Sequence, residues 1–180
     1  MIDPTSSLAS RHIALLGAMG SGKSTVGAAL AALVDRPFVD TDALVEQRAG
    51  ASIAELFAEV GEPQFRALEH RALLQALSSP SPSVVATGGG VVTFEPNLTL
   101  LNDSATVVWL VAPVEVLADR VGDGSSRPLL HGGSHRQALA ELLEARRPLY
   151  RDASDIEVDA ASGTPHDVAV SILDALGAHA

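Results

Sequence analysis

The segment from Gly17 to Ser24 has the residue types and spacing needed to hold a chain of phosphate groups. It reads Gly-Ala-Met-Gly-Ser-Gly-Lys-Ser and matches G-x-x-x-x-G-K-[ST] at every fixed position. Glycines let the backbone turn tightly, so that its N–H groups point at phosphate oxygens. The pattern predicts that Lys23 contacts the β- and γ-phosphates and that the Ser24 hydroxyl ligates Mg²⁺. The nucleotide-binding residues expected in this loop are Gly20, Ser21, Gly22, Lys23, Ser24 and Thr25, the last on the α-phosphate.

Two carboxylates stand one residue apart in Asp40-Thr41-Asp42, directly after a short apolar stretch. One could hold Mg²⁺ through water, while the other could accept a hydrogen bond from the hydroxyl of a substrate. Either carboxylate could instead cap the start of a helix, because aspartate is favoured at that position. The spacing leaves both interpretations open.

Arg66 lies four residues after Glu62 and three residues before Glu69, so all three share one face of a helix. The pattern suits a solvent-exposed stripe of ion pairs. It equally suits an arginine that Glu69 steers toward the carboxylate of a ligand, because a guanidinium group matches a carboxylate bidentately.

Three consecutive glycines, Gly88 to Gly90, follow a short apolar run. They indicate either a close approach of a small molecule to the backbone or a plain tight turn. Arg120 and Arg127 flank a Gly/Ser-rich segment, and a loop that carries such a cation could close over ATP. Arg146, near the expected end of a helix, could bind an anion or simply complement the helix dipole.

The segments between these residues alternate short apolar runs with amphipathic stretches, which is typical of an α/β fold with a parallel sheet. Ligands of such sheets bind at the carboxyl ends of the strands, where Asp40 and Asp42 are expected. We predict strands at 12–16, 38–39, 84–86, 106–111 and 156–158. We predict helices starting at 23, over 52–60, 63–77 and 113–121, from 134 to just before Pro148, and starting at 165.

Composition limits the class of protein. The chain has 180 residues, which fits one domain, and its formal net charge of −10 disfavours nucleic acid as a partner. There is no cysteine, so disulfides and thiolate metal sites are excluded. No apolar stretch is long enough to span a bilayer. We therefore expect a cytoplasmic monomer without a membrane partner.

The order of the motifs resembles the shikimate kinase family, over about 12–176. The resemblance rests on Gly17–Thr25, Asp40-x-Asp42, Phe65-Arg66-x-x-Glu69, Gly88–Gly90, Arg127-Pro-Leu-Leu and Arg146-x-x-x-Tyr150. It implies one three-layer α/β/α P-loop domain over 1–180, with a central five-stranded parallel sheet and a nucleoside-monophosphate-kinase-like fold. It also implies a substrate-binding helical segment at about 42–77 and a lid at about 120–134. The implied reaction is phosphorylation of shikimate by ATP, which gives shikimate 3-phosphate and ADP on the way to chorismate.

The resemblance also implies a role for each candidate residue. Asp42 would hold the reacting hydroxyl or act as its base, with Lys23 and Arg127 as the other catalytic residues. The implied substrate-binding residues are Asp42, Arg66, Gly88, Gly89, Gly90 and Arg146. Arg120 would lie over adenine, and Ser24 and Asp40 would bind Mg²⁺, Asp40 through water.

One position departs from the family pattern. Some members carry a basic residue on adenine where this chain has Gly163, so a looser preference for the nucleotide base is expected. The alternatives are a kinase of another small polyol acid such as gluconate, a nucleoside monophosphate kinase, and a nucleotide-binding module without catalysis. The glycine triplet and the two separate arginines, Arg66 and Arg146, favour shikimate.

Overall fold

The computed structural model describes residues 10–122 and 135–177. Within these ranges the strands are β1 (His12–Leu16), β2 (Phe38–Asp40), β3 (Val84–Ala86), β4 (Ala105–Val111) and β5 (Ile156–Asp159). The helices are α2 (Lys23–Leu33), α3 (Thr41–Ala49), α4 (Ile53–Leu77), the short 3-10 helix η1 (Val91–Thr93), α5 (Glu95–Ser104), α6 (Val114–Val121), α7 (His135–Ala153) and α8 (Pro165–Ala175).

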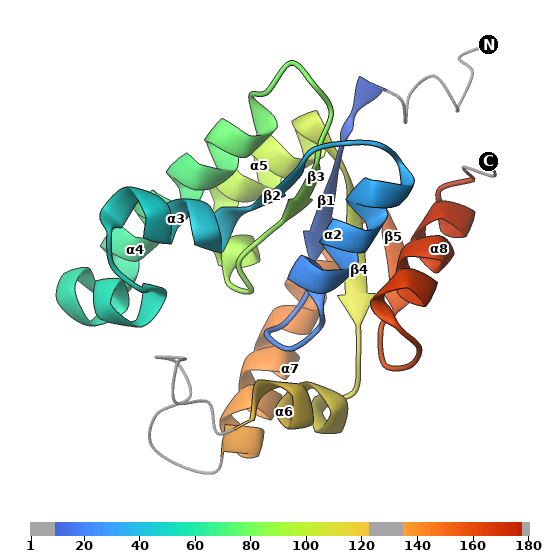
Figure 1. The fold of residues 1–180 in the computed structure, drawn as a ribbon. Helices are drawn as coiled ribbons and strands as arrows, with labels where there is room; N and C mark the ends of the chain where they lie inside the picture. The colour runs from blue at the N-terminus through green and yellow to red at the C-terminus, as the bar shows by residue number, and fades with distance from the viewer. Residues whose placement is uncertain (1–9, 123–134, 178–180) are drawn as a thin grey trace.

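The five strands form one parallel sheet, as predicted, and the structure gives their order as β2-β3-β1-β4-β5 (Figure 1). The strands are short apolar runs because both faces of the sheet are covered. Leu15 packs on one face with Leu30 of α2 and Ile172 of α8. Its neighbour Leu16 points to the other face and packs with Tyr150 of α7. Helices on both faces of a parallel sheet give the three layers that were expected.

The parallel order brings three chain segments to one edge of the sheet. β1, β2 and β3 all run in the same direction and end at Leu16, Asp40 and Ala86. The phosphate-loop motif, the aspartate pair and the glycine triplet follow these ends directly. Chemistry that lies far apart in the sequence is therefore gathered where open α/β sheets bind ligands.

Helix α4 contains the break that the sequence predicted between two helices. Gly61 has φ 75° and ψ 171°, which lies outside the helical region and kinks the helix. The start of α4 is a capping box, in which Ser52 Oγ accepts from Glu55 N–H and the Glu55 carboxylate accepts from Ser52 N–H. The kink allows the first part of α4 to turn back over the second part.

Four elements differ from the prediction. Helix α3 and the pair η1–α5 had not been predicted, and α5 lacks a side-chain cap at its start. Helix α7 continues through Pro148 to Ala153, although it was predicted to end before that proline. Proline costs a backbone hydrogen bond. Tyr150, which lies after Pro148 and is fully buried, supplies the packing that favours continuation. The predicted cap of α7 at residue 134 lies outside the described residues.

No helix within the described ranges is both long enough and apolar enough to cross a membrane.

Candidate active site

The phosphate-loop motif lies between β1 and α2, as its pattern requires. Lys23 Nζ donates to the carbonyl oxygens of Gly17 and Ala18, each at 2.9 Å, so its side chain folds back over the loop. Gly22 is the N-cap of α2, whose first N–H groups therefore face the loop. A loop of this form at the positive end of a helix is a binding site for phosphate.

Asp40 caps a helix, which is one of the roles that its sequence position left open, and its second oxygen is bonded to Ser24. Its Oδ1 accepts from the backbone N–H groups of Asp42 and Ala43, which caps α3. Its Oδ2 accepts from the Ser24 hydroxyl at 2.5 Å. Two hard oxygen donors thus lie side by side at the phosphate loop.

These donors fit Mg²⁺ bound largely by phosphate oxygens and water. No group of three or more His, Cys, Asp or Glu side chains that could hold a metal occurs in the part of the chain that the structure describes. Mg²⁺ in phosphoryl-transfer sites is usually bound by one or two protein oxygens together with the phosphates of the substrate. Ser24 and Asp40 match that donor set.

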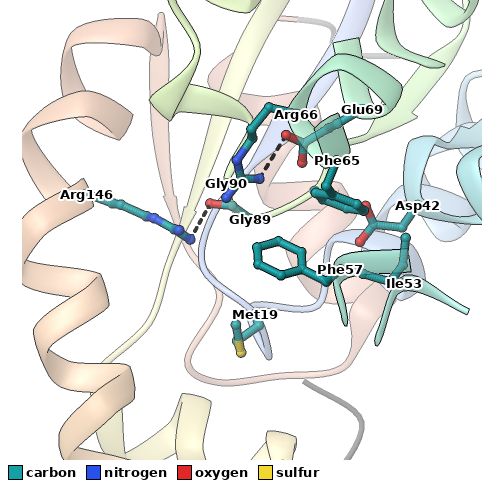
Figure 2. A pocket seen from close by; sticks show the side chains of 11 residues that line it. Met19, Asp42, Ile53, Phe57, Phe65, Arg66, Glu69, Gly89, Gly90 and Arg146 are labelled. Carbon is teal, nitrogen blue, oxygen red and sulfur yellow. Dashed lines mark hydrogen bonds and ion pairs between the residues drawn. The ribbon is translucent and has the colours of Figure 1, made fainter. Parts of the chain in front are cut away.

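A pocket beside the glycine triplet contains the residues expected to bind an acceptor, and we call it the acceptor pocket. Figure 2 shows Arg66 and Glu69 entering it from α4 and Arg146 from α7, with Asp42 on the opposite side of the view from Arg146. It is lined by Met19, Asp42, Ile53, Phe57, Phe65, Arg66, Glu69, Gly88, Gly89, Gly90 and Arg146.

Arg66 and Glu69 form a buried ion pair rather than a solvent-exposed stripe. Arg66 is 7% exposed and Glu69 is 1% exposed, and their side chains are joined at 3.0 Å. Arg66 also bonds Glu62 at 2.9 Å, while its Nε is buried and has no hydrogen-bond partner among the described residues. Burial raises the pKa of Glu69, and the charge of Arg66 opposes that rise. Desolvation is the largest influence on Arg66 and would lower its pKa, but the charges and hydrogen bonds of Glu69 and Glu62 together outweigh it, and the pKa of Arg66 is raised.

Two glycines of the triplet, Gly88 and Gly90, leave room for charged side chains that approach them closely. A Cβ at Gly88 would lie 2.3 Å from Glu69 Oε1 and 2.8 Å from Asp42 Oδ1. A Cβ at Gly90 would lie 2.2 Å from Arg66 Nη1. The triplet therefore does more than turn the chain, since it makes room for the polar side chains of the pocket.

The central carbonyl of the triplet is held from α7. Gly89 O accepts from Arg146 Nη1 at 3.2 Å and from the Tyr150 hydroxyl at 2.5 Å. Burial raises the pKa of Tyr150. Since α7 continues to Ala153, Arg146 does not lie in its last turn, and complementing the helix dipole does not explain its position.

A second pocket covers the phosphate loop, and we call it the phosphate pocket. It is lined by Met19, Gly20, Gly22, Lys23, Ser24, Thr25, Asp40, Asp42, Thr87, Gly89 and Arg120. Three residues, Met19, Asp42 and Gly89, line this pocket and the acceptor pocket alike. A group held at the phosphate loop would therefore meet a small molecule in the acceptor pocket at Asp42.

Arg120 also lines the phosphate pocket. Its guanidinium group donates to the carbonyl oxygens of Ala160 at 2.8 Å and Ala161 at 3.2 Å. It borders a further pocket, which also contains Gly163, the position where the family pattern is broken. Arg120 therefore lines both this pocket and the phosphate pocket. Arg127 lies outside the described residues.

Several residues of the site had not been identified from the sequence. Ile53, Phe57 and Phe65 form an apolar wall of the acceptor pocket, and the rings of the two phenylalanines lie 5.1 Å apart. Their apolar spacing suits one face of a helix, but nothing in the sequence indicates that they line a pocket. Thr41 Oγ accepts from Gly88 N–H at 3.2 Å and so fixes the aspartate pair to the glycine triplet. No sequence signal marks that contact. Tyr150 had been noted only as part of a motif.

Comparison with known proteins agrees with this geometry. Residues 19–177 match the family model described as shikimate kinase. A shikimate kinase of Caulobacter vibrioides is 47% identical over 175 residues, which is 97% of this chain and 86% of that protein. A shikimate kinase from Acinetobacter baumannii, solved in complex with shikimate, is 37% identical with a TM-score of 0.89 over 96% of both chains.

The alternative acceptor has a more distant counterpart. A gluconokinase from Sinorhizobium meliloti has a TM-score of 0.56 at 20% identity, over 94% of this chain and 93% of that one, so the likeness is one of fold alone. The family model and the two shikimate kinases cover nearly the whole chain at much higher similarity. This chain belongs to the shikimate kinase family.

Proposed function

We propose that this chain transfers the γ-phosphoryl group of ATP to the 3-hydroxyl of shikimate, giving shikimate 3-phosphate and ADP. The observation that carries the proposal is the shared wall of the two pockets, where Asp42 borders both the phosphate loop and the buried arginine of the acceptor pocket. The A. baumannii relative, which was solved with shikimate bound, supports the choice of acceptor.

The acceptor half of the site has the charges to hold a small carboxylic acid. Arg66 and Arg146 come from different helices and both border the pocket, at 7% and 9% exposure. A carboxylate between them would gain charge-assisted hydrogen bonds in a desolvated setting. Backbone groups of Gly88, Gly89 and Gly90 would contact the ring hydroxyls, and the apolar wall would face the ring.

The donor half is the phosphate loop with its neighbours. Gly20, Ser21, Gly22 and Thr25 would surround the phosphates, with Arg120 beside the base. Lys23 would exchange its carbonyl partners for β- and γ-phosphate oxygens. Ser24 and, through water, Asp40 would hold Mg²⁺, which when bound supplies positive charge that neutralises the phosphate oxygens.

Phosphoryl transfer depends mainly on positioning and on neutralising charge, and the chain supplies both. Asp42 would accept a hydrogen bond from the reacting hydroxyl, align it with the γ-phosphorus and receive its proton. Lys23 and Arg127 would stabilise charge on the transferring group. We further propose one domain over 1–180 that acts as a monomer, with the acceptor segment at about 42–77 and a lid at about 120–134.

A coupled ADP-release assay with Mg-ATP tests the proposal, with shikimate, gluconate and AMP offered in parallel. Fast release with shikimate alone is the expected result. Release with gluconate or AMP instead would retain the kinase and refute the proposed acceptor. Tight ATP binding without release for any of the three would indicate a nucleotide-binding module that has no catalysis.

A further inference from the structure

A buried asparagine joins the two elements that form the acceptor pocket. Asn97, in α5, is fully buried, and its Nδ2 donates to the carbonyl oxygen of Val91 at 3.0 Å. Its Oδ1 lies 2.7 Å from Nδ1 of His70. Val91 directly follows the glycine triplet, and His70 directly follows Glu69 in α4. One side chain therefore connects the end of the triplet with the helix that carries the buried ion pair.

The donors and acceptors of this link are fixed by its chemistry. The Val91 carbonyl only accepts, so the amide nitrogen of Asn97 must face it. That orientation leaves Oδ1 toward His70, and because an amide oxygen only accepts, Nδ1 of His70 must carry a proton. The His70 ring also lies edge-on to Phe94, with centroids 5.5 Å apart, which holds the ring in place.

Such a link matters because the contact between α4 and the triplet is polar. Arg66 lies against Gly90, and Glu69 lies against Gly88. His70 is four residues after Arg66 and therefore shares its side of the helix. Apolar packing does not fix the distance between these charged groups and the backbone of the glycine triplet, whereas directional hydrogen bonds do.

Hydrogen bonds tie the triplet to the turn that contains Val91 and Thr93. Val91 N–H donates to Gly88 O at 3.2 Å, and Thr93 Oγ donates to Gly90 O at 2.7 Å. A shift of the Val91 carbonyl would therefore be passed to the carbonyl and N–H groups that border the pocket. Neither Asn97 nor His70 lines the pocket itself.

We propose that Asn97 and His70 are positioning residues for the acceptor. They set the distance between the Arg66 guanidinium group and the glycine triplet, and so the width of the site for the acceptor carboxylate and hydroxyls. The proposal rests on the proposed function in that the acceptor binds in this pocket, while ATP binds elsewhere. It predicts a selective effect on the acceptor.

The test measures KM for the acceptor and KM for ATP separately, in four proteins: wild type, His70→Leu, His70→Asn and Asn97→Leu. His70→Leu removes the donor, and we expect the acceptor KM to rise about tenfold, equivalent to about 1.4 kcal/mol, with the ATP KM within about twofold. His70→Asn places an amide N–H where Nδ1 stood, and we expect it to restore the acceptor KM to within about threefold. Asn97→Leu leaves the buried Val91 carbonyl without its donor, so its effect should be larger.

His12 provides the control, because it is a buried histidine whose Nδ1 is bonded to Ser83, at the opposite end of β1 from the pocket. His12→Leu should lower the melting temperature and leave the acceptor KM unchanged. The proposal is overturned if His70→Leu raises both KM values alike, or if His70→Asn restores nothing. If Asn97→Leu fails to fold, the comparison of His70→Leu with His70→Asn still tests the proposal. Should wild type use gluconate instead of shikimate, the proposed function fails, and the same KM comparison with gluconate still tests the positioning.

Discussion

Replacing Arg66 should separate the stability of the fold from the binding of the acceptor. In Arg66→Met the Glu69 carboxylate, 1% exposed, loses its partner at 3.0 Å. Removing one member of a buried ion pair costs about 3–5 kcal/mol of unfolding free energy. Arg66→Met/Glu69→Gln removes both charges with similar shapes, so we expect it to recover at least about 2 kcal/mol of that loss.

The same two variants should be equally poor at binding shikimate. Each lacks the guanidinium group that would hold the carboxylate, and hydrogen bonds to charged groups contribute about 1.5–3 kcal/mol. A loss of about 2–3 kcal/mol corresponds to a rise in the shikimate KM of about 30- to 150-fold. The KM for ATP should stay within about twofold, because Arg66 does not border the phosphate pocket.

Urea unfolding and the ADP-release assay measure the two quantities on the same preparations. The stability defect of Arg66→Met should also depend on pH. Burial already raises the pKa of Glu69, and without Arg66 the pKa rises further. A carboxyl group with a raised folded pKa favours the folded state below its unfolded pKa, and that contribution is lost as pH rises through the folded pKa. The defect should therefore be smaller at about pH 5 than at about pH 8. A double variant that binds shikimate as wild type does would refute the assignment of Arg66, as would equal losses for shikimate and ATP.

Three further predictions concern other parts of the chain. Asp42→Asn should lower kcat by about 10²- to 10⁴-fold without lowering the melting temperature, and near-normal turnover would remove Asp42 from the chemistry. Burial lowers the pKa of His12, so as the pH falls this histidine is protonated in the unfolded chain before it is protonated in the folded chain. The contribution of neutral His12 to the free energy of unfolding is fully present above the ordinary pKa of histidine, and it is lost as the pH falls toward the pKa of His12 in the folded chain. Thermal melts should show a steeper decline between about pH 7 and pH 5 for wild type than for His12→Asn, and parallel curves would contradict this. GTP should replace ATP as phosphate donor with a kcat/KM within about tenfold of that for ATP. The reason is that the hydroxyls of Thr25 and Thr164, which line the pocket beside Arg120, already form hydrogen bonds within the protein and are not available to distinguish the two bases. A preference for ATP above about a hundredfold would show that other groups distinguish the bases.

The features that were predicted correctly from the sequence are those that depend on contiguous residues. The phosphate loop is one uninterrupted motif, and each strand is a short apolar run bounded by turn residues, so both could be located without a structure. The kink at Gly61 and the capping boxes at Ser52 and Thr164 are likewise local signals. Local chemistry is sufficient where the partners lie within a few residues of each other.

The sequence was less informative about elements whose position depends on contacts between residues that are distant in the chain. Helix α5 begins at Glu95 without a capping side chain, and its strongest anchor is the buried Asn97, whose partners lie in η1 and α4. Helix α7 passes Pro148 because Tyr150 is buried against the sheet, which no local propensity reveals. The apolar wall of the acceptor pocket was visible as a helix face, yet only the kink in α4 determines that Phe57 and Phe65 meet.

The single tryptophan of the chain is connected to the glycine triplet through Tyr150. Trp109 is stacked on Tyr150 with ring centroids 5.8 Å apart, and the hydroxyl of that tyrosine holds the Gly89 carbonyl. Movement of the glycine triplet would shift the tyrosine ring and so change the surroundings of the indole. The protein thus contains its own fluorescent reporter, and acceptor binding can be followed in the unlabelled enzyme without turnover.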